Sequence, residues 1–148
     1  MKKQTRMYNV LFPVWMLILF PQMWLIVLPG NFLIDSLVLL FGMYVLKIAE
    51  RGAFYKRNIL KIFLFGLLSD VVGASFMLLM LVLNISVMGD EWYFTVPAII
   101  ISSVCIFVLN YYVTFRTLDK NLRFKLAMTF ALATAPYTFL IPTSWLYY

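Results

Sequence analysis

The chain has 148 residues, of which 64% are hydrophobic and only 12% are charged, and its mean hydropathy is +0.94. Because soluble domains carry about 25% charged residues, this composition excludes an ordinary soluble domain and indicates one integral membrane domain over residues 1–148. Histidine is absent and Cys105 is the only cysteine, which excludes an internal disulfide and removes the commonest metal ligand and general base.

Five apolar segments follow one another and predict an all-α bundle of five transmembrane helices. They cover residues 11–28, 32–48, 59–87, 93–115 and 126–141, and the last is the shortest. A hydrocarbon core of about 30 Å takes about 20 helical residues to cross. The sequence "PGN" at residues 29–31 is the predicted connection between the first two spans. A cleaved signal peptide is the competing interpretation of residues 1–30, but "VLPGN" lacks a small-x-small cleavage site.

Positive charge marks one side of these predicted spans. All twelve Lys and Arg residues fall before the first span, within residues 47–61 where the second span ends and the third begins, or between the fourth and fifth spans. The positive-inside rule therefore places the N-terminus in the cytoplasm and the C-terminus outside. Six aromatic residues lie at the predicted outer ends, as in an interfacial belt: Trp24, Trp92, Tyr93, Trp145, Tyr147 and Tyr148. Since topology accounts for the charge, the expected partner is the lipid bilayer and not nucleic acid.

Two aspartates lie inside predicted spans. Asp70 is about 16 Å from Ile59 along its helix, near the midplane, where an ionised carboxyl costs about 2.5–3.5 kcal/mol. Asp35 falls in the first turn of the second span, near the outer interface, where the positive end of the helix dipole favours its charge. Helix-start chemistry is therefore the preferred interpretation of Asp35. The different depths argue against a carboxylate pair.

Asp70 shares one broad helical face with Gly66, Ser69, Gly73 and Met77. The Ser69–Gly73 pair allows close approach of another helix, so this face is predicted to point into the bundle. There we expect Asp70 to be protonated or hydrogen-bonded. The candidate partners are Ser102, Ser103, Asn110 and Thr134. A packing hydrogen bond, a proton- or cation-linked site and contact with another subunit all stay open.

Prolines and alanines predict further packing features. Pro13 and Pro21 in the first span and Pro136 in the fifth are predicted to kink their helices, because an interior proline removes a helix hydrogen bond. Such kinks shape packing, but they also occur at binding sites of transporters. Ala131 and Ala135, four residues apart, predict a small-residue packing face on the fifth span.

The stretch "PGNFLIDSLVLLFGMYVLK", the basic loop after it and "IFLFGLLSDVVGASFMLL" resemble the N-terminal half of MreD-type rod-shape-determining membrane proteins. Gly66, Asp70 and Gly73 match the Gly-apolar-apolar-x-Asp run and following glycine of that family, and Asp35 matches its earlier acid. The resemblance covers about a third of the chain; the family has six spans, and the C-terminal half shows no likeness. It implies a fold similar to the substrate-binding components of energy-coupling-factor transporters. It also implies contacts with other proteins in envelope assembly. The opening segments also resemble small uncharacterised bacterial membrane proteins.

Signatures of enzymes are missing from the sequence. It contains no metal-binding His or Cys pair, no Gly-rich phosphate loop and no Ser-x-x-Lys element. We therefore expect a non-enzymatic subunit or scaffold of the bacterial cytoplasmic membrane, without cofactor or metal, that contacts partner membrane proteins or copies of itself. The alternative is a small transporter or channel component with an acidic site at Asp70. A second acid facing Asp70 at the same depth would favour this alternative, but the predicted spans place none there.

Overall fold

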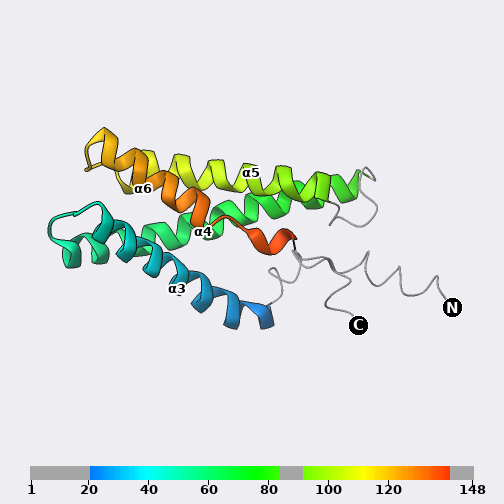
Figure 1. The fold of residues 1–148 in the computed structure, drawn as a ribbon. Helices are drawn as coiled ribbons and strands as arrows, with labels where there is room; N and C mark the ends of the chain where they lie inside the picture. Colours follow the sequence, from blue (N-terminus) through cyan, green and yellow to red (C-terminus); the bar gives the residue numbers. More distant parts are fainter. Residues whose placement is uncertain (1–20, 84–91, 141–148) are drawn as a thin grey trace.

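The computed structural model describes residues 21–83 and 92–140, and all regular structure within these two ranges is helical. Four α-helices, one π-helix and one 3-10 helix follow one another along the chain (Figure 1). They are α3 (Pro21–Val45), α4 (Arg51–Val82), α5 (Trp92–Leu109), η1 (Asn110–Thr114), α6 (Lys120–Ala133) and η2 (Tyr137–Leu140). The predicted all-α fold class is confirmed for this part of the chain.

The four α-helices form one bundle. Helix α4 packs against α3 and against α5, and α6 packs against the same two helices. Helices α4 and α5 run side by side over much of their length, whereas the first half of α3 diverges from them (Figure 1). The half of the bundle that contains α6 therefore holds the larger core.

Within residues 21–83 and 92–140, three helical segments are long and apolar enough to cross a membrane, namely Trp24–Val45, Arg51–Val82 and Trp92–Thr114. At about 1.5 Å per residue, each exceeds the roughly 30 Å of a hydrocarbon core. Their outer surfaces are apolar: Leu25 is 81% exposed and Phe41 is 65% exposed. Such surfaces fit contact with lipid, so the fold is that of a helical membrane protein.

The predicted connection at residues 29–31 is wrong, because α3 continues through "PGN" as one helix from Pro21 to Val45. Pro29 has no N–H to donate to the carbonyl four residues earlier. In apolar surroundings, the N–H and C=O groups of a non-helical backbone would find no water to form hydrogen bonds with. Continuing the helix, with one hydrogen bond missing, therefore costs less free energy than ending it. The predicted division between spans 11–28 and 32–48 is therefore lost, and Pro13 lies outside the described residues.

The third and fifth predicted spans also have different bounds. Helix α4 begins at Arg51, so much of the predicted basic connection forms its first turns, and it ends at Val82. The segment predicted at residues 126–141 contains the second half of α6, which stops at Ala133, and the short helix η2. With 14 residues, α6 is about 21 Å long and shorter than a hydrocarbon core. The five-span count and the N-in, C-out orientation stay predictions.

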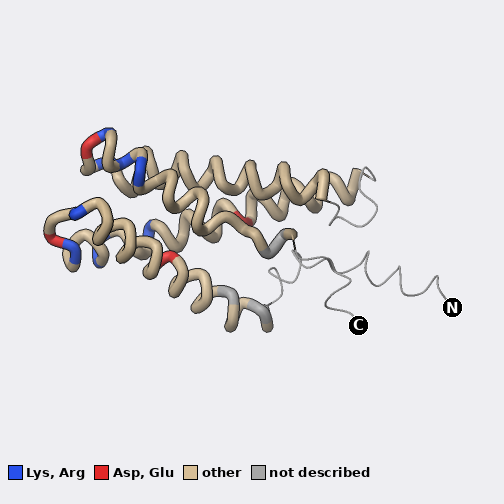
Figure 2. The backbone as a smooth tube through the Cα atoms, viewed as in Figure 1, with Lys and Arg blue, Asp and Glu red and all other residues tan. Residues whose placement is uncertain are grey.

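Positive charge gathers at one end of the bundle (Figure 2). The described basic residues belong to the turn after α3, the first three turns of α4, the connection after η1 and the first half of α6. They are Lys47, Arg51, Lys56, Arg57, Lys61, Arg116, Lys120, Arg123 and Lys125. We call this the basic end. At the opposite end, α5 begins with Trp92 and Tyr93. The described basic residues therefore follow the predicted grouping of charge.

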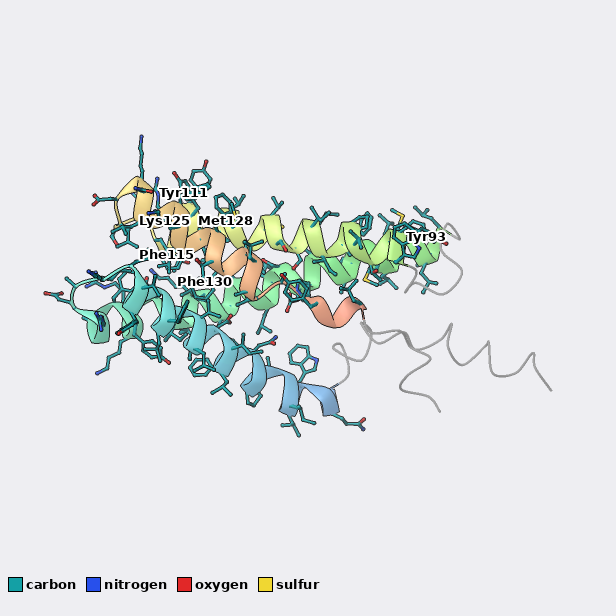
Figure 3. All side chains as sticks on the ribbon, in the orientation of Figure 1. Tyr93, Tyr111, Phe115, Lys125, Met128 and Phe130 are labelled. Atoms are coloured by element: carbon teal, nitrogen blue, oxygen red, sulfur yellow. The ribbon has the colours of Figure 1, made fainter. Side chains whose placement is uncertain are left out.

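The main core lies in the half of the bundle nearer the basic end. Phe115 and Phe130 are fully buried there, and their ring centroids lie 5.9 Å apart (Figure 3). Helix α3 comes very close to α6 in this core. A Cβ atom built on Gly42 would lie 2.5 Å from Cδ1 of Leu126, so this crossing requires a glycine or a shift of its neighbour.

Candidate functional site: two buried aspartates between the helices

Asp35 lies near the middle of α3 and is only 4% exposed. The prediction that it belongs to the first turn of a helix is wrong, because α3 begins well before residue 31. The positive end of a helix dipole is felt only within the first turn, so it does not stabilise a charge at Asp35. Helix-start chemistry therefore does not explain this carboxyl group.

Asp70 lies on α4 with a half-buried side chain. The hydroxyl of Ser102, on α5, donates a hydrogen bond to Oδ1 of Asp70 over 3.4 Å. Ser102 is fully buried and is one of the four partners considered from the sequence. Among the others, the hydroxyl of Thr134 instead donates to the carbonyl of Phe130.

The two aspartates approach the same part of α4. Oδ2 of Asp35 lies 3.6 Å from the position that a Cβ on Gly66 would occupy. Gly66 precedes Asp70 by four residues, which is about one turn on the same helix face. The carboxyl of Asp35 therefore reaches α4 about one turn from Asp70. One turn is about 5.4 Å, so the predicted difference in depth between the two acids stays a prediction.

Gly66 is what allows α3 to place a carboxyl group there. With no side chain on Gly66, the Asp35 carboxyl can lie directly against the backbone of α4, and a methyl group at residue 66 would still be at ordinary contact distance. A larger side chain would occupy the position of the carboxyl. The glycine was expected from the sequence to permit helix packing, and its observed neighbour is an acid.

The small residues expected to pack do so within the chain. Ser69 and Gly73 are buried on α4, and Ala131 and Ala135 are 5% and 8% exposed. The hydroxyl of Ser69 donates to the carbonyl of Phe65 over 2.7 Å, a bond within its own helix. These faces are therefore covered by the protein's own helices.

Neither Pro21 nor Pro136 lies in the interior of a described helix, where it was predicted to form a kink. Pro21 is the first described residue of α3, and Pro136 lies after α6, between that helix and η2. Pro136 thus follows a helix end and does not bend a continuous helix, as expected from the steric restriction that proline places on the preceding residue. Pro97 lies inside α5 and was not singled out from the sequence.

Asn110, the third polar candidate, is fully buried in η1, away from the aspartates along the chain. Neither its amide nitrogen nor its amide oxygen bonds to any described residue, and the hydroxyl of Thr114 is also buried without a described partner. Thr114 was missed in the sequence, although its spacing of four residues from Asn110 would have indicated a shared helix face. Ser36 was also missed; its hydroxyl and that of Tyr55 share a hydrogen bond of 2.9 Å between α3 and α4.

Comparisons with known proteins add no family. No family model, no curated protein and no solved structure matches the chain. The resemblance to MreD-type proteins therefore stays a prediction. Within the described residues, no group of three or more His, Cys, Asp and Glu side chains lies together as a metal ion would require.

Proposed function

We propose that the protein is a cation-linked transport component of the bacterial cytoplasmic membrane, in which Asp35 and Asp70 hold a proton or a monovalent cation. The observation that carries this proposal is the position of Asp35. Its carboxyl lies against Gly66 of α4, about one turn from Asp70, inside an apolar bundle. Ionisable groups within membrane segments are costly and mark ion or substrate pathways. A second acid near Asp70 would favour the transport interpretation, and Asp35 reaches α4 about one turn from Asp70.

The chemistry of the pair favours a bound positive charge. Two carboxylates close together in an apolar interior repel each other, and a proton or cation between them offsets this repulsion. The described Lys and Arg residues gather at the basic end, so they do not supply that charge. Ser102 gives Asp70 a single hydroxyl donor, which leaves the other carboxyl oxygens for a ligand.

The scaffold expected from the sequence is less well supported. That interpretation was based on the absence of enzyme signatures, on the small mass outside the membrane and on faces of small residues that would receive a partner helix. In the structure, four residues of these faces are buried by the chain's own helices: Ser69, Gly73, Ala131 and Ala135. A role in envelope assembly through partner contacts would therefore have to use the apolar outer surfaces.

We orient the basic end towards the cytoplasm by the positive-inside rule.

An apolar carbodiimide tests the proposal without knowledge of the transported substrate. Dicyclohexylcarbodiimide modifies protonated carboxyl groups in apolar surroundings, so we expect it to modify Asp70 or Asp35 in the purified protein in lipid vesicles. Protection by Na⁺ at constant pH indicates a sodium site, whereas protection by raised pH alone indicates a proton site. The Asp35→Asn and Asp70→Asn variants should lose modification at the changed residue, and Asp119→Asn, which changes an exposed acid, should not. Absence of modification at both buried acids would overturn the proposal.

A further inference from the structure

The π-helix η1 contains the most isolated polar side chains of the described bundle. Asn110 is 0% exposed and Thr114 is 3% exposed. The amide nitrogen, the amide oxygen and the hydroxyl of these two residues have no hydrogen-bond partner among the described residues. A buried amide that loses its bonds to water without replacement is strongly unfavourable. Something polar is therefore required beside them.

The backbone at this point supplies a reason for a polar ligand. The N–H of Phe115 donates to the carbonyl of Asn110 over 2.8 Å, a bond across five residues that defines the π-helix. Widened turns of this kind occur at functional positions, and helix ladders also open where water inserts into them. Asn110 and Thr114 lie four residues apart, so their side chains leave adjacent turns on one side of η1.

A fourth unpartnered atom lies on the helix that packs against η1. Nε of Arg123, on α6, is buried without a described partner, and its guanidinium carbon lies 4.3 Å from the centroid of the Tyr111 ring. Figure 3 shows Tyr111 at the basic end of the bundle. Unsatisfied polar atoms thus occur on both sides of the contact between η1 and α6, at the end where solvent is nearest.

We propose that Asn110 and Thr114 form an internal water-binding site near the basic end of the bundle. The chemistry of the site fits water in particular. The amide of Asn110 offers donors and an acceptor, and the hydroxyl of Thr114 offers both, which matches the two to four polar partners of a buried water. An anion could bind only the hydrogen-bond donors of these two side chains, and a cation only their acceptors.

The position of the site gives it a role that rests on the proposed function. Ser102, which bonds to Asp70, lies two turns before Asn110 on the same continuous helical segment. Ile106, 1% exposed, lies between them and separates the water site from the acid pair. With water at η1, a proton or cation moving between the cytoplasm and Asp70 would have to cross only the apolar segment around Ile106 without water.

Thiol accessibility tests the water site itself. In a Cys105→Ala background, we replace Asn110, Thr114 and Ile106 singly by cysteine and apply a membrane-impermeant cationic methanethiosulfonate to the basic side of sealed vesicles. Because only the thiolate reacts and it forms only in contact with water, we expect Asn110→Cys and Thr114→Cys to react at least about tenfold faster than Ile106→Cys. Equal rates at the three positions would overturn the proposal.

Unchanged protein provides a second measurement if the cysteine variants fail to fold. Hydroxyl radicals generated from water oxidise side chains beside bound water, so we expect oxidation within residues 110–115 to exceed, after correction for intrinsic reactivity, that of the fully buried Met77 on α4. Protection equal to that of Met77 would contradict the water site. Neither measurement involves transport, so a hydrated η1 with unreactive aspartates would reject the proposed function alone, and a dry η1 with reactive aspartates would reject the water site alone.

Discussion

Ser102 and Asp70 are joined across α4 and α5 by a hydrogen bond of 3.4 Å from the serine hydroxyl to Oδ1 of the aspartate. This bond is longer than the usual 2.5–3.0 Å between oxygens, so we expect it to contribute only modestly to stability. It nevertheless ties the acid to the longest contact between two helices of the bundle.

Replacement of Ser102 by alanine removes this donor from Asp70. We expect the Ser102→Ala variant to lose about 1 kcal/mol of unfolding free energy, measured by denaturant unfolding in mixed micelles. Ser103→Ala is the matched control, because Ser103 is less buried than its neighbour, and we expect a change within about 0.5 kcal/mol. An equal loss in the two variants would show that the bond to Asp70 contributes nothing measurable.

Because Gly66 has no side chain, the carboxyl of Asp35 lies against the backbone of α4 at this residue. A methyl group at residue 66 would lie 3.6 Å from Oδ2 of Asp35, an ordinary contact, so we expect Gly66→Ala to be close to neutral. Gly66→Leu would displace the carboxyl and should cost about 1–3 kcal/mol. The same unfolding measurement checks both variants, and a well-tolerated leucine would argue that Asp35 has no fixed position on α4.

Gly52 provides a control for the helix propensity of alanine. It lies in the first turn of α4, and nothing is within 4 Å of a Cβ built on it. Gly52→Ala should therefore gain up to about 1 kcal/mol from propensity alone. The difference between this gain and the effect of Gly66→Ala then measures the cost of contact with Asp35.

Gly42 and Leu126 form the tightest crossing of α3 with α6. Because a Cβ at residue 42 would lie 2.5 Å from Cδ1 of Leu126, which is fully buried, we expect Gly42→Ala to destabilise the protein by about 1–3 kcal/mol. Valine at residue 126 is shorter than leucine, so the Gly42→Ala/Leu126→Val double variant should recover part of the unfolding free energy that Gly42→Ala loses. A double-mutant cycle measures the coupling, and strict additivity would contradict the observed crossing.

Arg123 packs its guanidinium on the ring of Tyr111, 4.3 Å from the centroid. We expect Arg123→Gln to cost about 0.5–1 kcal/mol through loss of this cation–π contact, and Lys125→Gln, which changes an exposed charge on the same helix, to cost less. If the cost of Arg123→Gln disappears in a Tyr111→Leu background, the double-mutant cycle assigns that cost to the contact. An unchanged cost in that background would assign the effect to net charge.

Composition and charge were sufficient to predict the class of the fold. An apolar chain with basic residues in separate groups can satisfy its backbone in lipid only as helices or as a closed barrel, and the described elements are helical with their basic residues at one end. The inward face of α4 was also predictable, because Ser69, Gly73 and Met77 recur at helical spacing and all three are buried.

Two features could not be predicted, because both depend on the surroundings of the backbone. The tripeptide at residues 29–31 has the composition of a turn in water, yet α3 continues through it. That boundary alone placed Asp35 at a helix start and concealed its approach to Gly66. The π-helix at Asn110 has no local signature in the sequence, since an extra residue in a turn is stabilised by the packing around it.

The uninterrupted course of α3 through Pro29 also has a mechanical consequence. Where proline omits one hydrogen bond, a helix bends more readily than elsewhere. The segment from Pro21 to Pro29 forms an arm of about 12 Å, and a bend of about 20° at its base would move the far end by roughly 4 Å. The pivot lies six residues from Asp35, whose carboxyl lies against Gly66. A bend at Pro29 would therefore move the part of α3 nearest Pro21 and leave the contact between Asp35 and Gly66 in place.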